Sequence, residues 1–118
     1  MRTNPVLFVQ PPVAIEAIAD GPHRAELVRV YPFSNAYGDR IGFEFRLMDG
    51  NTVLHSAAPS RSPHGKLAES LHGLLGRDPT EDELVAPECL VGRSCTVVIR
   101  TVSNRSGKRY PSVIAITP

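Results

Sequence analysis

Alternation of apolar and polar residues is the clearest pattern in the chain, and it predicts strands. In RIGFEFRLMDG, the apolar residues at alternate positions from Ile41 to Leu47 fall on one face of an extended backbone. The positions between them, from Gly42 to Met48, fall on the opposite face. Asp49-Gly50 is a strong hairpin-turn pair, so residues 51–57 are expected to return as an antiparallel strand.

Three further runs are rich in strand-forming residues. HRAELVRVYPF predicts a first strand over about residues 23–32, and SNAYGDR after it has the composition of a turn. Near the end of the chain, GRSCTVVIRTVS and KRYPSVIAITP predict two strands joined by NRSG, whose glycine suits a hairpin loop. Pro111 places the last strand at a sheet edge or beside a bulge, because proline cannot donate to a ladder.

The stretch SRSPHGKLAESLHGLLGRD has helical rather than strand periodicity. Its leucines fall at i, i+4, i+7 and i+8, which makes one stripe of an amphipathic helix: Leu67, Leu71, Leu74 and Leu75. Ser62 suits the N-cap, Pro63 the first helical position and Gly76 the left-handed C-terminal position. The pattern therefore predicts a helix over about residues 63–75.

The order of these elements defines a fold class. Three strands, a helix over 63–75 and two more strands is the order of the mainly β, five-stranded Greek-key barrel called the OB-fold. Thr80-Glu-Asp-Glu83 is a capping-box sequence, so a short second helix is expected over about 80–86, before Pro87. An open α+β sheet with one helix on its face is the alternative that strand order leaves open. Residues 1–20 are interrupted by prolines and are interpreted as an extended N-terminal arm on a domain over 21–118.

Length and charge set further bounds. With 118 residues, 42% hydrophobic and 21% charged, the chain suits one globular domain. The formal net charge of +1 gives no strong overall field, so a basic binding surface has to be local. The apolar run VLFV is too short for a secretion signal or a membrane span, so we expect a cytoplasmic protein with no membrane partner.

No motif in the chain supports catalysis. HGKLA resembles part of a phosphate-binding loop, but Ser60 occupies the position of the first glycine and Leu67 that of the hydroxyl residue. Neither a nucleophile elbow nor a zinc-protease motif occurs. The sequence predicts that the protein is not an enzyme and uses no cofactor.

Histidines and cysteines give no metal site by their spacing. Cys89 and Cys95 are six residues apart with no further ligand nearby, which argues against zinc. Two buried reduced thiols are favoured, while a disulfide stays open. The histidines are interpreted as scattered surface residues: His23, His55, His64 and His72.

Basic and aromatic residues gather near two predicted loops. Tyr37 and Arg40, with Phe33 nearby, belong to the first interstrand loop, and Arg46 lies on the polar face of the next strand. In an OB-fold these positions and the last interstrand loop flank the ligand groove, where cations track phosphates and rings stack on bases. The alternative is that these are ordinary polar loops. The candidate residues in and beside the last loop are Arg105, Lys108, Arg109 and Tyr110.

Four segments in this order resemble a known group of proteins: DGPHRAELVRV, YGDRIGFEFRLMDG, SRSPHGKLAESLHGLLGR and LVGRSCTVVIRTVSNRSGKRYPSVIAITP. Over about residues 20–118 they resemble a diffuse family of small OB-fold proteins of phages, plasmids and bacterial genomes, many uncharacterised and some regarded as single-stranded-DNA-binding-like. The resemblance implies a non-enzymatic module that binds single-stranded nucleic acid weakly and without sequence preference. The alternative is an interaction or assembly module of the same fold, pairing with itself or a partner through strand edges.

Overall fold

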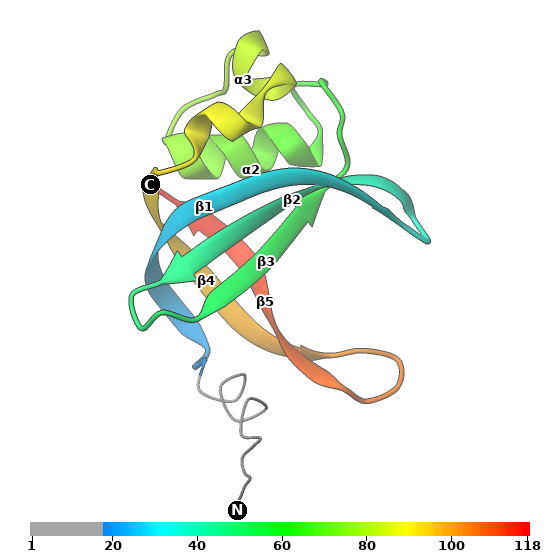
Figure 1. The fold of residues 1–118 in the computed structure, drawn as a ribbon, viewed down its shortest axis with the longest axis vertical. Coiled ribbons are helices and arrows are strands. Elements are labelled where there is room, and N and C mark those ends of the chain that lie inside the picture. Colours follow the sequence, from blue (N-terminus) through cyan, green and yellow to red (C-terminus); the bar gives the residue numbers. More distant parts are fainter. Residues whose placement is uncertain (1–17) are drawn as a thin grey trace, which may run out of the picture.

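The computed structural model describes residues 18–118, which form one antiparallel five-stranded sheet of order β3-β2-β1-β4-β5 with helices at one end (Figure 1). The mainly β prediction is confirmed. The elements are β1 Gly21–Asn35, β2 Gly38–Leu47, β3 Thr52–Ala57, α2 Lys66–Leu75, α3 Glu81–Val85, the 3-10 helix η2 Pro87–Leu90, β4 Ser94–Ser103 and β5 Arg109–Thr117.

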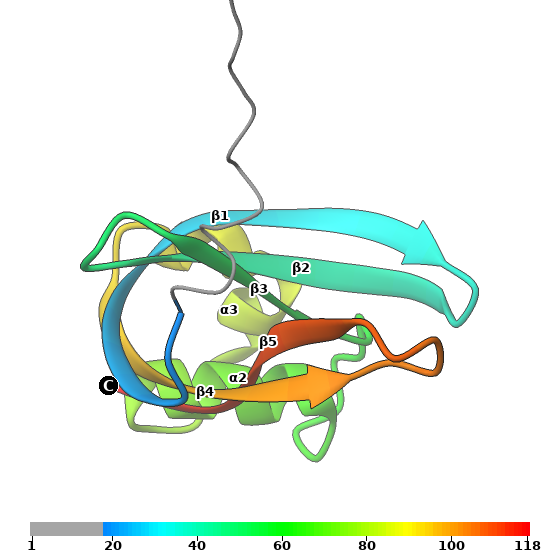
Figure 2. The same cartoon turned by 90° about the horizontal axis from the view of Figure 1, so that it is seen from below.

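β1 is the central strand and belongs to two ladders in succession. Its first part, Gly21–Glu26, pairs with β4, while β2 pairs with it from Ala25 to the hairpin turn. The two pairings overlap only briefly, so the far part of β1 and β2 continues past β4 to the edge of the molecule (Figure 2). β3 pairs with β2 as far as Ile41, and beyond it only the two strands β1 and β2 remain. We call residues 28–44 the distal hairpin.

The first strand is longer than predicted, and its turn is shorter. Only Ala36 and Tyr37 separate β1 from β2, so most of SNAYGDR is paired strand. The polar residues that suggested a loop bond to one another across the hairpin: Ser34 Oγ donates to Asp39 Oδ1 at 2.8 Å. Asn35 Oδ1 accepts from the backbone N–H of Tyr37 at 2.8 Å and shapes the two-residue turn.

The start of helix α2 differs from the prediction, while its end agrees. The helix begins at Lys66 rather than near Pro63, and its N-cap is Gly65, which offers no side chain to cap it. Ser62 instead closes the preceding turn: its Oγ accepts from His64 N at 3.2 Å and its carbonyl from Gly65 N at 3.1 Å. Gly76 ends the helix in the left-handed conformation, with φ 76°, as expected.

The short second helix forms as the capping box predicts. Thr80 Oγ1 accepts from Glu83 N at 3.2 Å, and the Glu83 carboxylate accepts from Thr80 N at 2.8 Å. α3 ends at Val85, and the chain continues from Pro87 as the short 3-10 helix η2.

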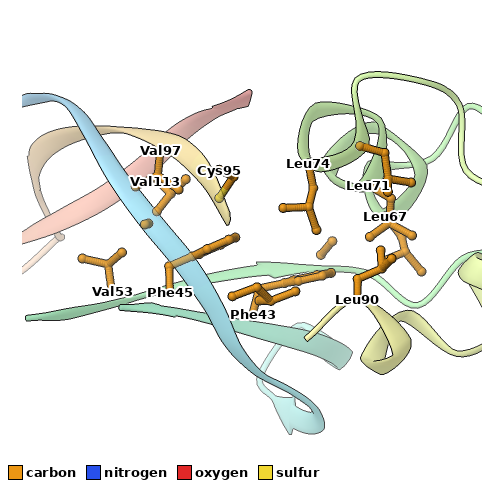
Figure 3. Close-up of a cluster of buried hydrophobic side chains, with 14 of the residues drawn as sticks. Phe43, Phe45, Val53, Leu67, Leu71, Leu74, Leu90, Cys95, Val97 and Val113 are labelled. Atoms are coloured by element: carbon orange, nitrogen blue, oxygen red, sulfur yellow. The ribbon is translucent and has the colours of Figure 1, made fainter. Parts of the chain in front are cut away.

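The core lies between the inner face of the sheet and the leucine stripe of α2 (Figure 3). The alternation predicted for β2 is confirmed in Phe43, Phe45 and Leu47, which are buried, whereas Met48 is exposed in the turn to β3. Buried residues of the core include Leu27, Val53, Leu67, Leu71, Leu74, Leu90, Cys95, Val97, Ile99 and Val113.

The two edge strands of the sheet approach each other. Cα atoms of β3 and β5 come within 8 Å. No ladder joins these two strands in the described part of the chain, so the sheet is not closed by hydrogen bonds. β5 is an edge strand, as Pro111 indicated. Its ladder with β4 has an irregularity between the pairings at Val113 and Ala115.

Two expectations for single side chains need correction. Cys89 and Cys95 are both free; Cys95 is buried as expected, but Cys89 is exposed, because it falls on the outer side of η2. His55 is half-buried rather than a surface residue, because its strand packs beside α2.

The predicted N-terminal arm lies mostly outside the described residues. Of its last residues, Ile18 is buried. Asp20 Oδ1 accepts from both N and Oγ1 of Thr101 at 2.8 Å, which fixes the start of β1 against β4.

Candidate functional site

The β4–β5 hairpin brings one group of predicted residues together. Arg105 and Lys108 lie in its turn, and Arg109 and Tyr110 are the first residues of β5. The side chain of Asn104 organises the turn, because its Oδ1 accepts from Ser106 N at 3.0 Å and Lys108 N at 2.9 Å. The three cations are exposed, and Tyr110 is 44% exposed.

Positive charge is not offset on this hairpin. No Asp or Glu occurs from Ser94 to the end of the chain. Among residues 18–118, none of Arg105, Lys108 and Arg109 has an acidic group within 4.0 Å. Arg109 does act at longer range on the carboxylate of Asp20. The pKa of Asp20 is lowered chiefly by the hydrogen bonds from Thr101 and further by the charges of Arg100 and Arg109.

The predicted cations of β2 have partners. Arg46 lies opposite Glu26 of β1 and forms an ion pair with it at 3.6 Å. Arg40 Nη2 donates to Ser56 Oγ of β3 at 3.1 Å, which orients its guanidinium without neutralising it. The charge of Arg46 is therefore offset by a carboxylate, whereas the charge of Arg40 is not offset by its hydrogen bond to Ser56.

Tyr37 lies apart from both groups. It occupies the turn between β1 and β2 and is 89% exposed. The β1–β2 and β4–β5 hairpins project toward the same side of the molecule in both views (Figures 1 and 2). The structure thus places the predicted residues on the β1–β2 hairpin, on the β4–β5 hairpin and along β2.

Sequence reasoning missed an aromatic group on the distal hairpin. The rings of Tyr31 and Phe33 lie on the same side of β1, with centroids 5.8 Å apart. The guanidinium of Arg29 lies 4.1 Å from the centroid of the Tyr31 ring, and Arg29 also pairs with Glu44 at 3.4 Å. The signal was present as Arg-x-Tyr-x-Phe, since alternate residues of a strand share a face, but Phe33 was assigned to a loop.

Gly42 allows these rings to lie against the sheet. It is directly opposite Tyr31 in the ladder. A Cβ at this position would come within 2.9 Å of Tyr31 Cζ and 3.1 Å of Phe33 Cε1. The ring-bearing residues of the aromatic group thus all belong to β1, and β2 contributes the space that the missing side chain of Gly42 leaves.

The half-buried His55 belongs to the support of the sheet. Ser70 Oγ donates its only proton to the carbonyl of Lys66 at 2.9 Å, so it accepts from His55 Nε2 at 2.8 Å. Burial, followed by the nearby Arg40, lowers the pKa of His55. The imidazole is therefore neutral at pH 7 and carries its proton on Nε2.

In residues 18–118, no group of three or more His, Cys, Asp or Glu side chains is arranged to hold a metal ion. Among the helices of the same residues, none has the length and apolar character needed to cross a membrane.

Comparison with known proteins adds no assignment. No protein-family model matches the chain, and a search of curated proteins finds no match.

Proposed function

We propose that the protein is a non-enzymatic OB-fold module that binds single-stranded nucleic acid weakly and without sequence preference. The observation that carries this proposal is the β4–β5 hairpin, where Arg105, Lys108 and Arg109 lack acidic partners within the described chain and Tyr110 is exposed beside them. Tyr37, Arg40 and Arg46 would extend the surface across the β1–β2 side.

Strand connectivity supports the OB-fold part of the proposal. β1 pairs with both β2 and β4, a helix lies between β3 and β4 in the chain, and the edges β3 and β5 approach each other. Pairing of β3 with β5 would close this arrangement into a Greek-key barrel. We also propose that the chain is related to the small phage, plasmid and bacterial OB-fold proteins that it resembles.

The chemistry of the surface accounts for weak and unselective binding. Arg and Lys contact phosphates, which all sequences share, and aromatic rings stack on any base. The net charge of +1 limits attraction from a distance, so affinity depends on the local cations. A plot of log K against log salt should fall with a slope that becomes steeper by about 0.7 for each phosphate neutralised on a single strand.

Fluorescence anisotropy tests the proposal directly. A labelled oligo-dT and a duplex of the same length are titrated with protein over a salt series. We expect the single strand to bind more tightly, with affinity that falls as salt rises. Lack of binding at low salt, or preference for the duplex, would contradict the proposal.

Assembly through strand edges is the second candidate. In the described chain, no strand pairs with the outer edge of β1 beyond Leu27, which leaves an edge open to another strand. Pro32 lies within that edge and cannot donate a backbone hydrogen bond, which disfavours continuous pairing. Light scattering distinguishes the candidates, because assembly requires a stable oligomer and nucleic-acid binding does not.

A further inference from the structure

One face of the distal hairpin continues the hydrophobic core outward, and we call it the inner face. Val30 and Ile41, which are partly buried, pack against the core from this face. Because alternate residues of a strand share a face, Pro32 lies beyond Val30 on the same side, directly opposite Ile41. The rings of Tyr31 and Phe33 lie on the other face of the hairpin.

Two adjoining hollows lie on the inner face. One has a volume of about 460 Å³ and lies between the hairpin and the chain segment of α3 and η2, where Val85, Pro87 and Glu88 line it. The other has a volume of about 470 Å³ and extends toward the hairpin turn, where Ser34, Asp39 and Pro59 line it. Both hollows are lined by Pro32 and Ile41, and we call the two together the inner groove.

The inner groove combines apolar side chains with unpaired carboxylates. Val85 is 50% exposed on the first hollow, although it is apolar. Glu88 lines one hollow and Asp39 the other, and neither carboxylate forms an ion pair within residues 18–118. Such a surface favours a ligand segment that joins apolar side chains to a positive charge.

The chain itself contains a segment of this chemistry. Residues 6–9, with the sequence VLFV, form an apolar run that lies outside the described residues. Arg2 is the only charged residue before Glu16, so the charge beside the run is positive. Residues 2–9 therefore complement the inner groove in both apolar character and charge.

The position of the run along the chain favours the groove of another molecule. Residue 9 is nine residues before Ile18 and can lie at most about 32 Å from it. Along β1, Gly21 and Val30 are also nine residues apart, which corresponds to about 30 Å of strand. To reach the groove of its own molecule, the run would need an almost fully extended connection along β1. A second copy of the chain has no such restriction.

We propose that the inner groove binds residues 6–9 of a second copy of this chain, so that two copies exchange these segments in a dimer. The exchange is reciprocal, because each copy carries one segment and one groove. It goes beyond the proposed function and does not depend on it, since no residue of the β4–β5 hairpin lines the groove.

Analytical ultracentrifugation of the whole chain over a concentration series tests the exchange. Phe8→Asp places a negative charge in the segment, and Val85→Asp places one in the groove. Ile114→Asp is the matched control, because Ile114 is also 50% exposed but lies in β5, outside the groove. Thermal unfolding of each variant establishes that it is folded before association is compared.

We expect the wild type to dimerise, and Phe8→Asp and Val85→Asp each to raise the dissociation constant of the dimer at least about tenfold, because a carboxylate is costly in an apolar contact. Ile114→Asp should dimerise as the wild type does. An equimolar mixture of Phe8→Asp and Val85→Asp should associate more tightly than either variant alone, since the first keeps its groove and the second keeps its segment.

Three results would overturn the exchange. The first is a wild type that stays monomeric over the whole series. The second is a dimer that both variants retain, because pairing would then use another surface, such as a strand edge. The third is a mixture that associates no better than its components, since a groove that accepts the segment of another copy requires this recovery.

Discussion

Gly73 of α2 lies directly against the backbone carbonyl of Ile116 in β5. A Cβ on Gly73 would clash with the carbonyl oxygen and come within 3.1 Å of the carbonyl carbon. Because a backbone carbonyl in a ladder cannot move aside as a flexible side chain can, the helix depends on glycine for its distance from the sheet. Gly73 thus serves the helix–sheet contact at the expense of its own helix propensity.

Replacing Gly73 with alanine should therefore destabilise the protein. Alanine gains about 1 kcal/mol in helix propensity, but overpacking at a rigid contact costs about 1–3 kcal/mol. We expect a net decrease of about 1 kcal/mol in the free energy of unfolding, measured by urea denaturation. Glu69→Ala in the same helix is the control, since Glu69 is exposed and should change stability by less than about 0.5 kcal/mol. A Gly73→Ala variant as stable as the wild type would contradict the close contact.

Ion pairing of Glu83 should make stability depend on acid pH. Hydrogen bonds from Arg77 and from the backbone of Thr80 lower the pKa of Glu83 from its ordinary 4.5 to about 2. A carboxyl with a lowered folded pKa adds stability above its unfolded pKa and loses it as the pH falls toward the folded value. Glu83→Gln should therefore be less stable than the wild type at pH 7.

The difference between Glu83→Gln and the wild type should shrink as the pH falls from about 4.5 toward 2. Urea unfolding at several pH values measures it. Glu81→Gln is the matched control, because Glu81 shares the first turn of α3 but forms no ion pair within the described chain. If both variants followed the same pH profile, the interaction with Arg77 would not be responsible.

His55 should give a pH dependence of the same sign as Glu83, but closer to neutrality. Burial, with a further contribution from Arg40, lowers its pKa below the ordinary 6.5, so the unfolded chain binds a proton more readily than the folded protein. Stability should fall as the pH drops below about 6.5 and level off below the folded pKa. His55→Gln, which can still donate to Ser70, should show a flatter profile between pH 7.5 and about 5.5.

NMR titration of the His55 ring provides an independent measurement. A folded pKa at or above the ordinary value would contradict the role assigned to burial. Lys66 and Glu69 also influence this imidazole, with opposing effects, so the same titration in Glu69→Gln should show a further lowering.

The two cysteines should differ strongly in reactivity. Cys89 is exposed, whereas Cys95 is fully buried and burial raises its pKa to about 11. A thiol reagent at pH 8 should modify Cys89 in the native protein and reach Cys95 only after unfolding, because the thiolate is the reactive form. Mass spectrometry of digested protein locates the label. Equal labelling of both residues without denaturant would contradict the packing of Cys95.

Cations on the two sides of the proposed surface should contribute unequally to binding. Arg105→Gln and Arg109→Gln should each weaken oligo-dT binding. Each should also make the fall of log K with log salt less steep, by about 0.7 for each phosphate that is no longer neutralised. Arg46→Gln should have a smaller effect, because Glu26 already offsets its charge. Anisotropy over a salt series measures both. An Arg46 variant with the larger slope change would move the proposed surface away from the β4–β5 hairpin.

Local patterns were sufficient to predict most elements. The alternation around Phe43 and Phe45 correctly gave the buried face of β2, and the leucine stripe gave the buried face of α2. The capping box at Thr80 and the left-handed Gly76 were also correct. These signals work because side-chain periodicity and capping depend on residues close together in the chain.

The errors arose where a residue's partner is distant or lies across a hairpin. Ser34 and Asp39 suggest a loop until the ladder places them face to face. Ser62 and Pro63 satisfy the rules for a helix start, yet their turn precedes it. Choosing between such alternatives requires pairing and packing energies, which local propensity does not contain.

For the candidate site, the sequence by itself determined the residue types and the two hairpins that carry them. Tertiary structure decided which charges are available: Arg46 is paired with Glu26, while Arg105 and Arg109 have no acidic neighbour among the described residues. It also placed Phe33 over Gly42. Charge pairing and ring packing across strands depend on ladder register, and register is fixed only when the whole sheet forms.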